Sequence, residues 1–275
     1  MPLDQISDEK EMSFLDHLEE LRWHIIRSMI AIVTFAIVAF AAKSFIIDTV
    51  ILGPSRVDFW SYQKLCELAE VLKTPAICVD DLPFKIQVRT VSGQFMTHIV
   101  VSFIAGLILG FPYLFWEIWR FIKPGLRPQE RRASRGATFS VSVLFTLGIL
   151  FGYFVISPIS VRFFATYEIS SMLQNEWDLS SYINTVTMVV LGCGLLFQLP
   201  VIVYFLTKAG IVSSSLMKAY RKHAIIVILI LGAIITPPDP FSQILIAMPL
   251  MMLYQLGIVI AKRIEKREAR QNKER

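Results

Sequence analysis

Two glutamates are candidates for binding a cation at a membrane surface. Glu20 lies in the segment S-F-L-D-H-L-E-E-L-R-W-H (13–24), directly before the first apolar run. Glu130 lies in W-R-F-I-K-P-G-L-R-P-Q-E-R-R (119–132), where every other charged residue is basic. A carboxylate can hold a planar guanidinium through two parallel hydrogen bonds, so either residue could receive an arginine from a ligand. The simpler alternatives are an acidic, solvated helix face around Glu20 and a local ion pair for Glu130.

The sequence lacks the common patterns of catalysis and metal binding. It contains no G-x-S-x-G, no H-E-x-x-H, no P-loop and no pair of aspartates within an apolar run. Cys66 and Cys78 have no nearby Cys or His that would complete a metal site. Their spacing is compatible both with a disulfide and with two free thiols. We therefore expect a protein that is not an enzyme and uses no metal or cofactor.

Long apolar runs predict an all-α protein that crosses a membrane several times. Hydrophobic residues make up 55% of the 275 residues and charged residues only 18%. Because a membrane core needs roughly 20 helical residues, the chain has room for six spans. The last two should be short, since T-P-P-D-P (236–240) interrupts the apolar sequence. The predicted spans are 24–47, 95–119, 138–160, 183–206, 223–236 and 241–261.

These spans divide the chain into three parts. Residues 1–23 form an amphipathic segment, which we expect to be a short helix at the membrane interface. Residues 24–261 form the six-helix membrane domain. Residues 262–275 form a basic tail, expected to be a frayed helix end or disordered.

The distribution of Lys and Arg predicts the orientation. Segments 1–23, 120–135, 207–222 and 262–275 hold two, six, four and seven of these residues. Segments 48–92, 161–182 and 237–240 hold five, one and none. Because cytoplasmic loops carry the excess of basic residues, both termini should be cytoplasmic and the 48–92 loop should lie outside.

Gln198 is the notable polar residue inside the predicted spans. It lies in G-L-L-F-Q-L-P (194–200), two residues before Pro200. A buried amide in a membrane needs a partner on a neighbouring helix. That partner could be within this chain or on another subunit, and the sequence favours neither. We see no acid within the spans of the kind that solute transporters use.

Four of these segments together resemble the TatC family of Sec-independent protein translocases. H-L-E-E-L-R (17–22), F-I-K-P-G-L…E-R-R (121–132), F-Q-L-P (197–200) and T-P-P-D-P-F-S-Q (236–243) occur in the order and topological places of that family's motifs. The resemblance covers residues from about 14 to 262. One departure is Gln198, where many members carry a glutamate, so a role that needs a proton or full charge there is in doubt.

The resemblance implies a receptor for twin-arginine signal peptides in the bacterial cytoplasmic membrane. It implies that the protein is the core scaffold of a machine that exports folded proteins with the proton-motive force. The implied partners are TatA-like and TatB-like single-span subunits. The alternative is an ion-coupled secondary transporter of a small solute.

The family's functional residues carry over to matching positions. The resemblance implies signal-peptide binding by Glu20, Glu130, His17, Leu18, Arg22, Phe121 and Leu126. It implies contact with a partner helix at Gln198 and Pro200. It also implies a structural turn built from Pro237, Pro238, Asp239 and Gln243.

Overall fold

The computed structural model describes residues 14–74, 78–79, 81–123, 136–170, 172, 174–235 and 239–273. Helices dominate, as predicted, and two three-residue strands, β1 (Lys85–Gln87) and β2 (Glu176–Asp178), pair in parallel. Five helical segments in the described residues are long and apolar enough to cross a membrane. The helices are α1 (Phe14–Ala41), η1 (Ser44–Ile51), η2 (Gly53–Ser55), α2 (Trp60–Leu72), α3 (Gly93–Ile122), α5 (Ala137–Phe151), η5 (Gly152–Ile156), α6 (Ser157–Thr166), α7 (Leu179–Leu196), α8 (Leu199–Lys208), α9 (Ser214–Ala219), α10 (Arg221–Ile235) and α11 (Pro240–Lys273).

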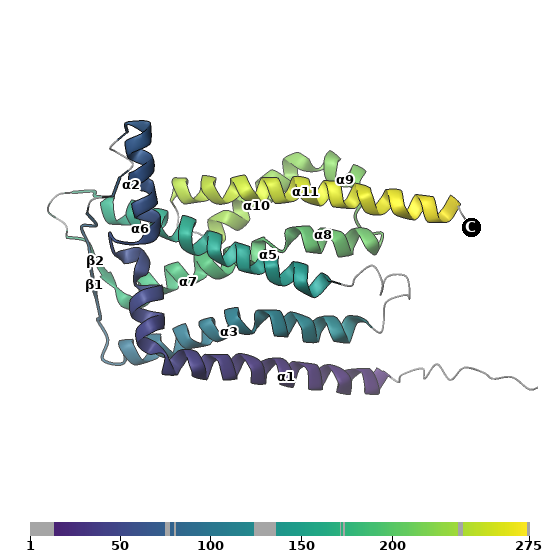
Figure 1. Cartoon of the computed structure of the whole chain (residues 1–275), viewed down its shortest axis with the longest axis horizontal. Coiled ribbons are helices and arrows are strands. Elements are labelled where there is room, and N and C mark those ends of the chain that lie inside the picture. The colour runs from purple at the N-terminus through teal and green to yellow at the C-terminus, as the bar shows by residue number, and fades with distance from the viewer. Residues whose placement is uncertain are drawn as a thin grey trace, which may run out of the picture.

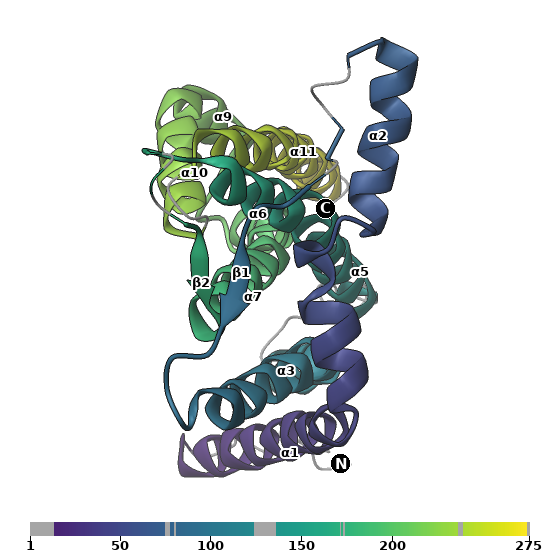
Figure 2. The same cartoon turned by 90° about the vertical axis from the view of Figure 1, so that its left-hand side faces the viewer.

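The long helices run side by side along the longest axis of the molecule (Figure 1). At one end α1 begins, α3 ends, α5 begins and α11 ends, and we call this the termini end (Figure 1). The opposite end, here the far end, carries α2, α6 and the two strands (Figures 1 and 2). The first described residue, Phe14, and the last, Lys273, therefore lie on the same side of the bundle.

The first and last spans differ from their predicted limits. The first was predicted as 24–47, but α1 begins at Phe14 and already ends at Ala41. Helix α1 is continuous from Phe14 to Ala41, so the predicted separate interfacial helix is wrong. No Gly or Pro occurs between these residues, so nothing stops the helix at residue 23. Helix α11 likewise continues to Lys273, and the basic residues that follow 261 prolong it. A strongly charged sequence of good helix formers can extend an apolar helix beyond the membrane.

Two other spans are interrupted. The 183–206 span consists of α7 and α8, which meet at a turn over Phe197 and Gln198. Pro200 explains this boundary, because proline is tolerated in the first turn of a helix and not in its interior. The 138–160 span combines α5, the π-helical segment η5 and α6. Helix α10 has only 15 residues, which agrees with the predicted short fifth helix. The predicted shortness of the sixth helix is wrong, because α11 has 34 residues.

A glycine allows α1 and α3 to approach closely. A Cβ atom added to Gly106 of α3 would lie 2.6 Å from the Ala36 nitrogen and 2.7 Å from the Ile32 carbonyl oxygen of α1. Small residues that permit backbone contact are typical of helix pairs in membranes. One turn later, a Cβ added to Gly110 would have its nearest contact at 3.3 Å, with the Ile32 side chain.

We expect Gly106→Ala to lower the stability of the folded chain by about 1–3 kcal/mol, because the new methyl group meets backbone that cannot move independently. Gly110→Ala is the matched control and should have a much smaller effect, since a side chain can adjust. Thermal unfolding of both variants in the same detergent measures the difference. Equal melting temperatures for the two variants would contradict this packing.

Tyrosine hydroxyls hold the far end together. Tyr62 of α2 is fully buried and donates to the carbonyls of Pro54 and Pro158, each at 2.9 Å. Burial raises the pKa of Tyr62 above its ordinary value, so its hydroxyl stays a donor at neutral pH. Tyr153 and Tyr182 donate to the carbonyls of Val50 and Ile51 at 2.7 and 2.8 Å. These bonds satisfy backbone groups where the helices end.

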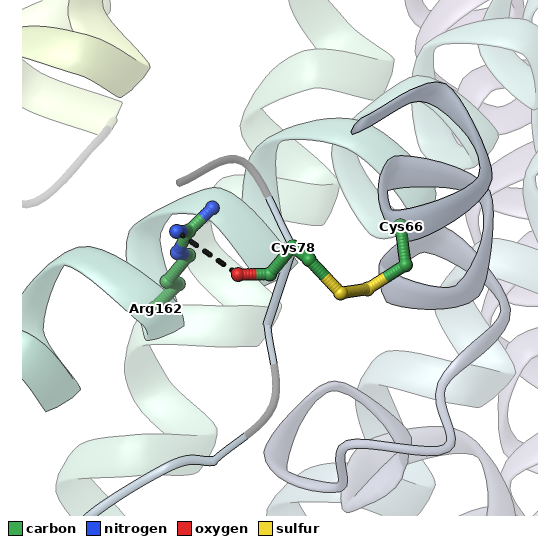
Figure 3. The surroundings of a disulfide bond; sticks show 3 residues. All are labelled: Cys66, Cys78 and Arg162. Carbon is green, nitrogen blue, oxygen red and sulfur yellow. Dashed lines mark hydrogen bonds between the residues drawn. A yellow bond between two sulfur atoms is a disulfide. The ribbon is translucent and has the colours of Figure 1, made fainter. Parts of the chain in front are cut away.

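A disulfide fixes the position of α2. The sequence left the pairing of Cys66 and Cys78 open, and the structure joins them (Figure 3). Arg162 of α6 donates from its guanidinium to the Cys78 carbonyl at 3.4 Å (Figure 3). The bond therefore ties α2 to the segment that follows it, and the arginine ties that segment to the third span.

Candidate functional site

Glu20 lies on the first turns of α1, at the termini end, and its side chain is 39% exposed. One turn later His24 is buried, with its Nε2 atom 3.8 Å from Glu20 Oε1. The spacing of four residues places both side chains on one helix face. The second carboxylate oxygen of Glu20 is buried and makes no hydrogen bond to any residue that the structure describes. Glu20 thus has one oxygen near His24 and one without a described partner.

His24 also contacts a second carboxylate, on α3. Glu117 is only 1% exposed, although it belongs to a membrane-length apolar helix. Its Oε2 atom contacts His24 Nδ1 directly, and its Oε1 accepts a hydrogen bond from Tyr113, one turn earlier on α3, at 2.8 Å. The ring of Phe121 packs edge-on against the His24 ring, with 6.0 Å between the centroids. We call Glu20, His24, Tyr113 and Glu117 the carboxylate–histidine cluster.

Exposure distinguishes the two acids of this cluster. A carboxylate buried in apolar surroundings needs hydrogen-bond partners, and Glu117 has His24 and Tyr113 as partners. The side chain of Glu20 is 39% exposed and that of Glu117 only 1%. Glu20 is therefore the acid that a ligand at the termini end can reach.

Of the four residues in this cluster, only Glu20 was predicted from the sequence. No acid was predicted within the spans, and Glu117 shows that this was wrong. The sequence did contain a signal, which is the glutamate in L-F-W-E-I-W (114–119). A search of the first span for a histidine at the same depth would have found His24. The pair becomes visible only when α1 and α3 are packed together, because His24 and Glu117 are 93 residues apart in the sequence.

The other predicted binding residues lie partly outside the described residues. Arg22 is exposed on α1, and Phe121 is half-buried beside His24. His17 and Leu18 belong to the described helix α1, but their side chains are not described. Glu130 and Leu126 lie outside the described residues. The structure therefore brings Glu20 and Phe121 to one place and gives no position for Glu130.

Gln198 makes its hydrogen bonds within the chain. Its amide nitrogen donates to the carbonyl of Gly194 at 3.3 Å and to that of Val141 on α5 at 3.4 Å. Its amide oxygen is buried and has no hydrogen-bond partner in the part of the chain that the structure describes. Pro200, two residues later, is buried in the first turn of α8. The donors thus connect the break between α7 and α8 to α5.

Asp239 caps α11 and attaches it to the third span. Its carboxylate accepts from the backbone nitrogen of Ser242 at 2.6 Å and from the Ser160 hydroxyl of α6 at 3.3 Å. Gln243 donates from its side chain to the Leu229 carbonyl of α10 at 3.4 Å. Pro237 and Pro238 lie outside the described residues. Asp239 and Gln243 therefore make contacts that fix the α10–α11 connection.

The fold and the cluster define a multi-pass α-helical membrane protein with a charged, partly buried site at the end of the bundle where its described chain begins and ends. The model of the Sec-independent protein translocase protein family, TatC, matches residues 16–249. The chain belongs to this TatC family.

Individual relatives agree along nearly the whole chain. The TatC protein of Blattabacterium sp. subsp. Periplaneta americana is 40% identical over 264 residues, which cover 95% of this chain and 99% of that protein. The TatC protein of Carboxydothermus hydrogenoformans is 34% identical, with 95% and 97% covered. A crystal structure of the twin-arginine translocase receptor TatC superposes with a TM-score of 0.65 at 28% identity, over 90% of this chain and 98% of that one. A second, in DDM, gives a TM-score of 0.69 at 28% identity, with 89% and 99% covered.

Proposed function

We propose that this chain is the receptor for twin-arginine signal peptides and the core scaffold of a translocase that exports folded proteins. The observation that carries the proposal is the geometry of Glu20. Its carboxylate is positioned by His24, which Glu117 orients from α3. The family membership and the similarity to two crystal structures of the twin-arginine translocase receptor TatC support the same function.

The proposed chemistry is the capture of a guanidinium pair by two carboxylates. Glu20 is the accessible acid of the cluster, with 39% of its side chain exposed at the termini end. Glu130 would supply the second carboxylate, because it belongs to the basic segment 120–135 between the second and third spans, and α3 ends at Ile122 on the same side. Arginine is bound by two parallel hydrogen bonds that lysine cannot make, so the site would select Arg-Arg over Lys-Lys. Phe121 and Leu126, with His17, Leu18 and Arg22, would complete it.

The proposed membrane arrangement has six crossings with both termini in the cytoplasm. The basic segments 120–135 and 207–222 begin where α3 and α8 end, and the basic residues after 261 form the last part of α11, all at the termini end, as expected for a cytoplasmic side. Helix α10 would be the short fifth crossing, since 15 residues rise only about 22 Å. The bilayer would have to thin beside it, because a normal core is about 30 Å thick. The membrane would be the bacterial cytoplasmic membrane.

The proposed machine includes single-span subunits of the TatA and TatB kinds and uses the proton-motive force. The sequence contains no P-loop, so nucleotide hydrolysis would need another subunit. Gln198 and Pro200 would contact a partner helix at the α7–α8 break, where the glutamine oxygen has no described hydrogen-bond partner. The chain itself would act by binding and not by catalysis.

One observation in the structure favours the alternative function, a secondary transporter of a small solute. Transporters use intramembrane acids, and Glu117 is one. Glu117 is, however, already engaged by His24 and Tyr113. The sequence also shows no internal repeat of the kind found in transporters. We therefore assign Glu117 to the positioning of Glu20.

The proposed function is tested by photo-crosslinking. A peptide with two adjacent arginines and a photoreactive residue beside them should label the chain near Glu20 and near Phe121. A small-solute transporter would not react with such a peptide.

A further inference from the structure

Helix α2 runs across the far end of the bundle, crosswise to the long helices (Figures 1 and 2). Its apolar side chains Trp60, Leu68, Val71 and Leu72 are between 48% and 79% exposed. At 100° per residue these four positions fall on one stripe about 120° wide. The opposite side of the helix is buried, with Tyr62 and Ala69 against the rest of the chain. Exposure of such an apolar stripe to water would cost free energy.

The contacts of α2 show which way this stripe faces. The Trp60 ring packs edge-on against Phe154 of η5, with 5.5 Å between the centroids, and the Ser61 hydroxyl donates to the Phe154 carbonyl at 2.5 Å. On the buried side, Tyr62 instead donates to the Pro158 carbonyl. Phe154 precedes Pro158 on the third span and is therefore nearer the middle of the bundle. The side of α2 that carries Trp60 thus points back along the spans, and the side that carries Tyr62 points away.

The level of α2 coincides with the expected edge of the membrane core. The third span begins at Ala137, at the termini end. About 20 helical residues cross the hydrocarbon core, so its far boundary falls near residue 157. This position lies between Phe154 and Pro158, the two residues that hold α2. Tryptophan is enriched at this interface, because its ring is apolar and its N–H is polar.

We propose that α2 is an interfacial helix that inserts the stripe of Trp60, Leu68, Val71 and Leu72 into the lipid leaflet at the far end. The occupant of the stripe is the phospholipid bilayer, because the stripe continues the lipid-facing surface of the third span through the Trp60–Phe154 contact. The polar edge of the helix, with Gln63, Glu67 and Glu70, is exposed and faces water. Lys64 lies within the arc of the stripe, and its ammonium forms an ion pair at 2.7 Å with Glu67 on the adjoining polar edge. The long lysine chain lets this ion pair lie at the level of the headgroups.

Two features hold α2 in the rotation that this insertion needs. The Cys66–Cys78 disulfide and the Tyr62 hydroxyl both act on the side away from the stripe. A helix of 13 residues fixed in this way cannot turn its apolar side to the bundle. The inference is independent of which cargo the chain recognises, since it concerns only the far end.

Neighbouring residues 70 and 71 allow a matched test. Glu70 and Val71 are both exposed and lie at the same level of the helix, but only Val71 belongs to the stripe. The photoreactive amino acid benzoylphenylalanine is placed at one position or the other in the full chain, with the native disulfide intact. The two proteins are reconstituted in phosphatidylethanolamine–phosphatidylglycerol nanodiscs, irradiated, and weighed intact by mass spectrometry. Equal melting temperatures confirm that both are folded.

We expect about tenfold more phospholipid adduct from position 71 than from position 70, because an interfacial helix buries only its apolar side in the acyl region. Equal or negligible lipid adducts at the two positions would overturn the proposal. A product of twice the chain mass from position 71, in discs that hold two copies, would also overturn it and would assign the stripe to a contact between copies.

Discussion

Replacing Glu20 by glutamine should weaken the binding of a twin-arginine peptide by about 10- to 100-fold. A hydrogen bond to a charged group contributes about 1.5–3 kcal/mol, and each 1.4 kcal/mol corresponds to a tenfold change in affinity. Glutamine keeps the shape of the side chain and an oxygen that His24 can face, so the loss would be that of the charge. Fluorescence anisotropy of a labelled peptide, titrated with the chain in nanodiscs, measures it.

Glu19→Gln is the matched control for this substitution. Glu19 is exposed and lies beside Glu20 in the sequence, but about 100° around the helix from it. The Glu19→Gln substitution changes the net charge of α1 by the same amount as Glu20→Gln, so it measures any long-range effect of charge alone. We expect its affinity to stay within about twofold of the unaltered chain. A similar loss in both variants would show that the peptide senses general charge and not a site at Glu20.

Removing His24 should cause the largest loss of stability. His24→Leu leaves the buried Glu117 with only the Tyr113 hydroxyl as a described hydrogen-bond partner. Breaking a buried ion pair from one side typically costs about 3–5 kcal/mol, because the remaining charge is uncompensated. The double variant His24→Leu with Glu117→Leu removes that charge and should recover more than half of the loss. Chemical or thermal unfolding in one detergent measures the unaltered chain, the two single variants and the double variant.

A second histidine between the same two helices provides the control. His98 of α3 contacts the Phe40 carbonyl of α1 at 3.1 Å and stacks on the Phe40 ring. It has no carboxylate partner in these contacts, so His98→Leu should cost only about 1 kcal/mol. Additive effects of the two substitutions at His24 and Glu117 would contradict the coupling on which the positioning of Glu20 depends.

The sequence predicted the membrane class and most spans because apolar runs of 18 or more residues have few alternatives. The ends of α1 and α11 were harder to predict from the sequence, since a helix need not end where its apolar residues end. In the sequence, Pro200 was the only sign of the break at Gln198. The sequence alone did not distinguish a kink within one helix from a turn between two helices. The predicted shortness of the fifth helix follows directly from the prolines after it.

Of the carboxylate–histidine cluster, only Glu20 could be predicted. Glu20 could be proposed from its place beside the first span and from the family resemblance. The pairing of His24 with Glu117 depends on the rotation of α1 against α3, which the close approach at Gly106 helps to set. Such a contact between distant residues has no local sequence pattern. The stripe on α2 was hidden for the same reason, because its meaning depends on which side Tyr62 and Cys66 bury.

Photo-crosslinking of a twin-arginine peptide tests the central claim most directly. The peptide carries a diazirine residue beside its arginine pair and is added to the chain in nanodiscs, where both membrane faces are accessible. Mass spectrometry then maps the adducts, and a peptide with two lysines serves as the control. Adducts near Glu20 on α1 and near Phe121 on α3, strong for the arginine peptide and weak for the lysine peptide, are the predicted result. Adducts at the far end, on α2 or beside the two strands, or equal labelling by both peptides, would contradict it.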